Sequence, residues 1–211
     1  MKKNLIFAFV LLLTSLQGFS QNSMQGLFGG KTKLTFLGLD FTQAKFIGDA
    51  AAFSNPSAIE NQMIPSWNSL LVLEPKKFAL DKAFKLGSDR YETYIDDMSG
   101  LNKKVKVDDN ITMNPYEINE TTVFKSVASY SLSKTDGVGV VYVVESLDKI
   151  SEKMTVWVTF IDLSNKKILH TEKISAKAAG FGFRNYWAGA VANVGKQIGS
   201  SYYKEWSKKF K

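Results

Sequence analysis

The chain contains no cysteine among its 211 residues. This absence excludes disulfides, thiolate zinc sites and cysteine nucleophiles, and it excludes the acylated cysteine that anchors bacterial lipoproteins. Histidine is almost as scarce, because His170 is the only one. A lone histidine without a second ligand nearby in the sequence is a poor metal ligand, so we expect neither a metal nor a cofactor.

Long apolar runs are scarce as well, except at the start of the chain. Lys2 and Lys3 precede an uninterrupted apolar run at residues 5–13, and Gly18-Phe19-Ser20 places small residues around a cleavage point before Gln21. These are the three parts of a secretory signal peptide. The sequence therefore predicts a cleavable signal peptide over residues 1–20.

The alternative for this segment is a membrane anchor. A spanning helix needs about 20 apolar residues, and Thr14, Ser15 and Gln17 break this run well short of that length. We therefore expect no stable membrane span after cleavage, a flexible leader over residues 21–30, and a single globular α/β domain over residues 31–211. The product is expected to be soluble, periplasmic or secreted, and not a lipoprotein.

Charge of one sign is not strongly in excess. The chain has 27 basic and 20 acidic residues, and loss of Lys2 and Lys3 leaves 25 basic residues and a charge of about +5. No stripe of basic residues with interleaved aromatics is present, so nucleic acid is not an expected partner. The modest excess favours anionic partners only weakly.

The first half of the chain alternates strand and helix patterns. Residues 34–41 are strand-like, and a helix begins at Ser54-Asn55-Pro56, where a capping side chain precedes a proline. Pro65 should kink or split that helix. Further elements are a strand over 90–96, a long polar loop over 97–115 with a short strand at 105–107, and a helix from Asn119 to Tyr130.

The second half has clearer patterns. Residues 138–144 are almost continuously apolar, as expected for a central strand covered on both faces. Residues 154–163 and 167–175 flank a tight-turn signal, which predicts a three-stranded meander. A long helix then runs from about Asn185 to the end, with apolar residues three or four apart.

These elements predict an α/β (α+β) fold. The expected architecture is a mixed sheet of about five strands with a C-terminal antiparallel meander and about three packed helices, in the order β-α-β-α-β-β-β-α. Gly195 and Gly199 lie four apart on the last helix, where we expect them to let it pack closely on the sheet.

The segment Val138 to Lys209 resembles a type of exported bacterial α/β domain. The phrase FIDLSNKKILHTEK (residues 160–173) is similar to a hairpin in curli-secretion and penicillin-binding-protein-activator domains, and GFGFRNYWAGA (residues 180–190) resembles uncharacterised exported proteins. The resemblance implies a periplasmic α/β domain. Those families carry a lipidated cysteine that this chain lacks, so their outer-membrane tether is not implied here.

The most unusual segment is Gly180 to Trp187, where glycines flank aromatic residues just before the last helix. Free amides and Arg184 at a helix start can hold a phosphate or carboxylate, and exposed aromatics can anchor a protein or a sugar. The other interpretation, which we favour, is a tight strand-to-helix joint whose aromatics fill the core, with Asn185 as the cap. The candidate binding residues are Phe181, Phe183, Arg184, Tyr186 and Trp187.

Two acidic clusters, Asp96-Asp97 and Asp108-Asp109, are the best oxygen-ligand candidates. Their spacing does not match an EF-hand loop, and a solvated loop is the favoured interpretation. Paired carboxylates also permit glycoside hydrolysis, but only if they lie at the right separation. No nucleotide-binding glycine motif, serine elbow or zinc-protease motif is present.

The sequence therefore predicts a non-enzymatic exported cell-envelope protein that acts as a binding or assembly domain, with an envelope protein as its partner. One alternative is a hydrolase that acts on an envelope or extracellular polymer through the loop carboxylates. Another is a small-anion binder at the start of the last helix. The oligomeric state is left open.

Overall fold

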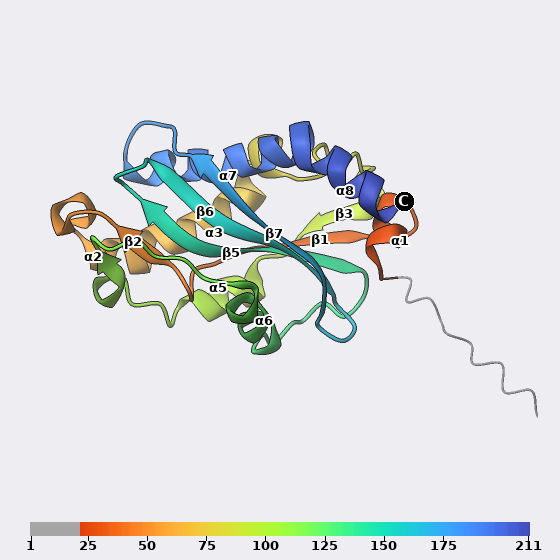
Figure 1. The fold of residues 1–211 in the computed structure, drawn as a ribbon, viewed down its shortest axis with the longest axis horizontal. Coiled ribbons are helices and arrows are strands. Elements are labelled where there is room, and N and C mark those ends of the chain that lie inside the picture. Colours follow the sequence, from red (N-terminus) through yellow and green to blue (C-terminus); the bar gives the residue numbers. More distant parts are fainter. Residues whose placement is uncertain (1–21) are drawn as a thin grey trace, which may run out of the picture.

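The computed structural model describes residues 22–211, which form one mixed sheet with helices on both of its faces (Figure 1). The predicted signal peptide lies outside the described residues. The α/β class predicted from the sequence is confirmed. Within residues 22–211, no helix combines the length and the apolar character needed to cross a membrane.

The central strand of the sheet is β5. β1 and β2 lie one after the other along one edge of β5, both parallel to it, and β6 lies along the other edge, antiparallel. β3 extends the sheet beyond β1, β4 beyond β2, and β7 beyond β6. The strands are β1 (Leu34–Asp40), β2 (Lys45–Ile47), β3 (Tyr91–Thr93), β4 (Ile111–Thr112), β5 (Val138–Asp148), β6 (Lys153–Asp162) and β7 (Lys167–Lys177).

The described strands number seven where about five were expected. β2, β3 and β4 have only two or three residues each, too few for an alternating pattern to be visible in the sequence. The strand expected over 90–96 is limited to Tyr91–Thr93, and a helix begins at Asp96. The expected strand at 105–107 is absent from the described sheet, although Val105 and Val107 are buried.

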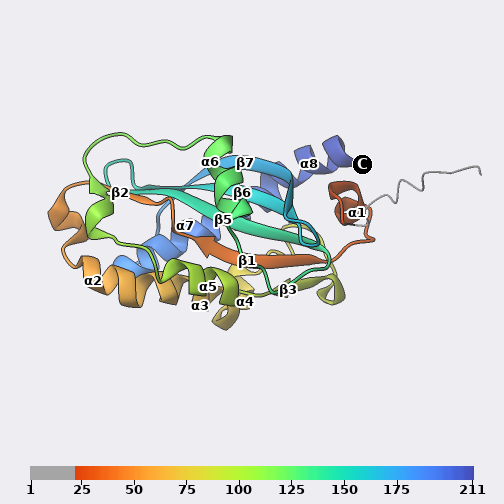
Figure 2. The same cartoon turned by 90° about the horizontal axis from the view of Figure 1, so that it is seen from below.

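Helices cover both faces of the sheet. Figure 2 shows α6 over one face and α7 behind the other. The longer helices are α3 (Ile64–Leu73), α5 (Asp96–Asn102), α6 (Glu120–Ala128), α7 (Phe183–Gln197) and α8 (Tyr203–Phe210). The shorter helical segments are α1 (Met24–Phe28), η1 (Ala50–Phe53), α2 (Pro56–Ala58), η2 (Ile59–Met63), α4 (Pro75–Phe78), η3 (Ser88–Arg90), η4 (Asp108–Asn110) and η5 (Ile198–Tyr202).

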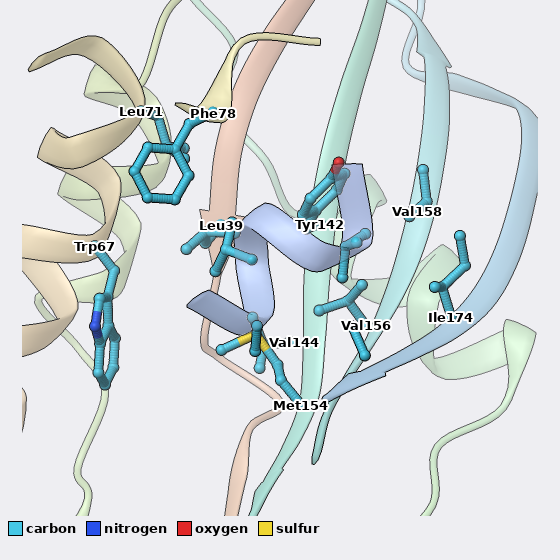
Figure 3. Packing of buried hydrophobic residues seen from close by; sticks show 14 of the residues in the cluster. Leu39, Trp67, Leu71, Phe78, Tyr142, Val144, Met154, Val156, Val158 and Ile174 are labelled. Atoms are coloured by element: carbon cyan, nitrogen blue, oxygen red, sulfur yellow. The ribbon is translucent and has the colours of Figure 1, made fainter. Parts of the chain in front are cut away.

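The two-sided core explains why β5 is apolar over residues 138–144. Its side chains alternate between faces, so Tyr142 and Val144 pack with Val156 and Ile174 beneath α7 (Figure 3). Val141 and Val143 belong to the second cluster, with apolar residues of α5 and α6. Burial of both faces explains why polar side chains appear on this strand only in its last part, at Glu145, Ser146 and Asp148.

A flexible leader was expected over residues 21–30; its described part, residues 22–30, contains a short helix with buried side chains. Ser23 caps α1 by accepting a hydrogen bond from the Gly26 amide at 3.0 Å. Met24, Leu27 and Phe28 are buried, and the Phe28 ring lies 6.3 Å from the ring of Phe210. The partner of this short helix is α8, at the opposite end of the chain, so no local pattern could reveal it.

The helix interrupted by Pro65 forms as expected. Proline has no N–H to donate and its ring crowds the carbonyl four residues earlier. One turn before it, residues 59–63 form a π turn in which the Ile64 amide bonds the Ile59 carbonyl. The helix then continues as α3 to Leu73.

A buried polar cluster holds the chain where it leaves β1. The carboxamide of Asn68 bonds both the amide and the carbonyl of Leu39, and Asn102 donates to that same carbonyl. Tyr130 donates to the buried carboxyl of Asp40, whose pKa is raised by desolvation. The two asparagines satisfy the backbone groups of Leu39 in the part of β1 that extends beyond its pairing with β3.

The last helix differs in three details from the prediction. It begins at Phe183, and Gly182, with φ of 77°, takes the cap position instead of Asn185. It is interrupted by the π turn η5. Gly195 and Gly199 face Leu80 and Ala83 of a neighbouring chain segment, so the close packing they permit is not against the sheet.

Candidate functional site

The joint between β7 and α7, residues 178–182, is held firmly to the elements on either side. The Ala178 amide donates to the Glu152 carbonyl at 2.8 Å, which ties the joint to the turn between β5 and β6. The Ala179 amide donates to the Tyr186 carbonyl at 3.1 Å, and the Tyr186 amide donates to the Gly182 carbonyl at 2.9 Å. The backbone of the joint is therefore fixed by bonds to two other elements.

Glycine is required in this joint. A Cβ atom at Gly180, where φ is 136°, would lie 2.6 Å from the Asn185 carbonyl oxygen. A Cβ atom at Gly189 would lie 1.7 Å from the Ala179 carbonyl oxygen, so the helix and the joint touch backbone to backbone. The glycines thus allow a sharp reversal that places residue 181 at its tip.

Two of the predicted site residues pack inward. Trp187 is completely buried. Phe183 is half-buried, with its ring 6.0 Å from that of Phe53 and 6.3 Å from that of Trp67. The indole N–H of Trp67 donates to the Arg184 carbonyl at 2.8 Å. These residues fasten the start of α7 to η1 and α3, which agrees with the packing interpretation for this part of the segment.

Phe181 points the other way. It is 96% exposed, more than any other large apolar side chain identified as exposed in residues 22–211. Tyr186 is intermediate: its ring packs 5.2 Å from Trp187, and the Lys149 ammonium lies 4.2 Å from its centre. Partial burial and the nearby Glu152 raise the pKa of the Tyr186 phenol.

Arg184 is exposed and its guanidinium turns to its own neighbour. Nε and one terminal nitrogen donate to the Asn185 side-chain oxygen at 3.2 and 3.1 Å. Asn185 is therefore engaged by Arg184 rather than by the helix amides it was expected to cap. The anion-binding interpretation of this residue stays a prediction.

Two further apolar side chains lie at the same end of the sheet. Ile150, in the turn between β5 and β6, is 63% exposed, and Met113, after β4, is 61% exposed. Both line one pocket of about 380 Å³. Neither Phe181 nor Lys149 lines that pocket. We call Phe181 and Lys149 the Phe181 surface, because the Ala178–Glu152 bond ties the joint to the turn that carries Lys149; Figure 1 shows the joint before α7 beside the β5–β6 turn.

Sequence reasoning missed Met113 and Ile150. Each is a single apolar residue within a polar segment, and only the sheet brings their segments together. It also missed Glu145, which lines the same pocket and is buried. Its carboxylate lies 2.9 Å from Lys173 Nζ and accepts from the Ile118 amide and the Trp157 indole, both at 3.0 Å. Three donors satisfy this carboxylate, and the bond from Ile118 fastens the loop before α6 to the sheet.

The acidic clusters do not converge on one site. Asp97 accepts from the Ser133 amide at 2.8 Å and from its hydroxyl at 2.7 Å, so it braces a loop. Asp96 begins α5, and Asp108 and Asp109 form the start of η4. Within the described part of the chain, no group of three or more histidine, cysteine, aspartate or glutamate side chains is arranged to hold a metal ion.

His170 is packed among aromatic rings. Its ring lies 6.1 Å from Phe160, 5.5 Å from Trp206 and 5.3 Å from Phe210. Burial and the nearby Lys209 ammonium lower its pKa from 6.5 to about 4, although Glu172 lies 3.6 Å from Nε2. The imidazole is therefore neutral at pH 7 and acts as a core ring.

No family model, no curated protein and no solved structure matches this chain. The resemblance of residues 138–209 to exported α/β domains therefore stays a prediction from sequence.

Proposed function

We propose that this chain is a non-enzymatic, exported cell-envelope protein that acts as a binding or assembly domain, and that it contacts a protein partner through the Phe181 surface. The observation that carries the proposal is the position of Phe181, a phenylalanine that is 96% exposed at the tip of a joint whose backbone is fixed on both sides.

An aromatic side chain in this position is suited to binding. Transfer of a phenylalanine from water to an apolar pocket is worth roughly 1.5 to 3 kcal/mol. Because the glycine joint is already ordered by its bonds to Glu152 and Tyr186, little conformational entropy is lost when a partner covers it. Phe181 makes no contribution to the described core, so binding offers a reason for its presence.

The surroundings favour a partner with an acidic rim. Lys153 and Lys177 lie directly opposite each other across the β6–β7 pair, and both are exposed. Like charges at opposed positions of a sheet repel. Together with Lys149 they outnumber Asp148 and Glu152 of the same turn, and an acidic rim on the partner would relieve that repulsion.

Export is the second part of the proposal, and it rests on the signal sequence over residues 1–20. The mature protein should begin at Gln21 and should be recovered outside the cytoplasm. Intact-mass measurement of the protein from fractionated cells tests this directly. A product that retains Met1 to Ser20 in the cytoplasmic fraction would contradict it.

The partner interface is tested with a photoreactive phenylalanine analogue at position 181 in cells of the source organism. A discrete crosslinked product should form there and not at Phe124, which is 46% exposed on α6 and serves as the control. With the partner identified and purified, Phe181→Ser should weaken binding by about 10-fold or more, whereas Phe124→Ser should change it less than about 2-fold. Equal crosslinking at both positions, or unchanged affinity, would overturn the proposal.

A further inference from the structure

A groove of about 740 Å³ lies between the segment Lys76–Ala83 and the final helix. Its rim carries four exposed lysines, and its floor consists of small or apolar residues. We call this feature the lysine groove. The rim residues are Lys76, Lys77, Lys82 and Lys196.

The floor of the groove is built from small residues, so the two segments that form it can approach each other without filling the space between the lysines. A Cβ atom on Gly195 would already lie 3.4 Å from Leu80, and one on Gly199 would lie 3.3 Å from the Ala83 Cα atom. Ala79 and Ala192 complete the floor. The final helix and the neighbouring segment therefore approach closely without large side chains between them, which leaves a shallow, open depression.

Positive charge on the rim is not balanced from within the groove, because none of the residues that line it is acidic. Lys77 has a partner outside it, Glu74, at 3.9 Å. Lys196 contacts the neutral side-chain oxygen of Asn193 at 3.3 Å. Several cations around one concavity raise the local concentration of anions there and accelerate their association.

The final helix is irregular at this place. Residues 198–202 form a π turn, which places Gly199 and Ser200 on the groove wall. π turns are rare, and they occur frequently at functional sites. This irregularity is an observation separate from the charge of the rim.

We propose that the lysine groove binds an acidic peptide segment of a partner protein, with aspartate or glutamate side chains at the four rim lysines and small side chains on the floor. A shallow depression that runs between two chain segments suits one extended peptide, with its acidic side chains directed at the lysines on either side. The aromatic ring on the floor, Phe78, is buried, so bases of a nucleic acid have no exposed ring to stack on.

This inference concerns a surface other than the proposed partner interface. Gly195 lies 12 residues beyond Phe183, which corresponds to about 18 Å along a helix. The two sites can therefore be tested independently. Phe181→Ser should leave binding in the lysine groove unchanged.

The probe is a fluorescein-labelled peptide that alternates aspartate with alanine, and its control has asparagine in place of aspartate. Fluorescence anisotropy with the full mature protein at low salt should show binding of the aspartate peptide at least 10-fold tighter than that of the control. Because exposed charges are screened by salt, the affinity should fall steeply as ionic strength rises.

Two variants test the site. Replacement of the four rim lysines by serine should weaken binding by at least 10-fold, whereas a matched variant that removes four exposed lysines elsewhere should lose less than about 3-fold. Ser200→Trp keeps every lysine and fills the groove, so it should also abolish binding. The matched variant replaces Lys31, Lys104, Lys125 and Lys167 by serine.

Several outcomes would overturn the proposal. These are equal binding of both peptides, equal losses in the two lysine variants, or full binding by Ser200→Trp. Binding to vesicles of phosphatidylglycerol without binding to the peptide would assign the surface to membranes instead. Self-association on gel filtration that the rim variant abolishes would assign it to a second copy of this chain.

Discussion

The two ends of the final helix both carry aromatic residues that pack inward, but only the joint before its start leaves an aromatic ring fully in solvent. At its start, glycines turn the chain outward and Phe181 is left in solvent. At its end, Trp206 packs into the core and Phe210 stacks against Phe28 of α1. Composition is similar at the two ends, so the backbone path and the available partners decide whether an aromatic ring is displayed or buried.

The largest expected effect separates Trp187 from Phe181. Trp187→Ala removes a completely buried indole and should lower the free energy of unfolding by about 3 to 5 kcal/mol. Phe181→Ala should change it by less than about 0.5 kcal/mol, because that ring contacts no core residue. Urea unfolding measures both free energies, if it is monitored by far-UV circular dichroism, a signal that does not rely on tryptophan fluorescence. Similar losses in the two variants would mean that Phe181 is packed.

At the opposite end of the final helix, Phe28→Ala should lower the free energy of unfolding by about 3 kcal/mol, because it removes a buried ring that packs against Tyr203 and Phe210. Thermal or urea unfolding of the mature protein gives the value. Lys31→Ala, in an exposed neighbouring position, is the control and should be nearly neutral. A neutral Phe28→Ala would restore the expectation of a flexible leader over residues 21–30.

The rigidity of the joint is tested with Gly189→Ala. Its Cβ atom would collide with the Ala179 carbonyl oxygen, so the joint must shift, at a cost of about 2 kcal/mol. Gly182→Ala meets no nearby atom but has a positive φ, so it should cost only about 1 kcal/mol. If Gly189→Ala proved the milder change, the backbone contact would not hold the joint.

The smallest effect concerns His170 and pH. Its folded pKa of about 4 lies below the unfolded value of 6.5, so the unfolded chain binds a proton first. Stability is therefore complete above pH 6.5 and decreases as the pH falls toward 4. Between pH 7 and 5 the wild type should lose about 1 kcal/mol more than His170→Phe, a value reduced for partial solvent exposure. Parallel urea titrations at the two pH values decide this.

The meander and the helices α3, α6 and α7 could be predicted because their patterns are local, whereas α5 lies in residues that were expected to be a polar loop. The apolar run in β5 and the alternation in β6 are each visible in about ten residues, as is the cap of α6 at Asn119, which accepts from the Thr122 amide at 3.0 Å. By contrast, β4 has two residues and pairs with β2, more than sixty positions earlier. A two-residue strand has no period of its own, so its pairing cannot be inferred from the sequence around it.

The candidate site was found only in part. The glycine-flanked aromatic segment was visible, but which ring turns outward depends on Trp67, Phe53 and the β5–β6 turn, all distant in sequence. The lysine groove was missed because Lys82 and Lys196 approach only through the packing of Gly199 against Ala83.

The sequence by itself determined the α/β class, the order of β1, α3, α6, the meander and α7, and the expectation of export, because hydrophobic periodicity and signal-peptide features are properties of short consecutive segments. Only the tertiary structure decided that Phe181 is displayed while Trp187 is buried, that α1 packs on α8, and that four lysines surround one groove. These features depend on contacts between residues far apart in the chain, and exposure is defined only when all of those contacts are in place.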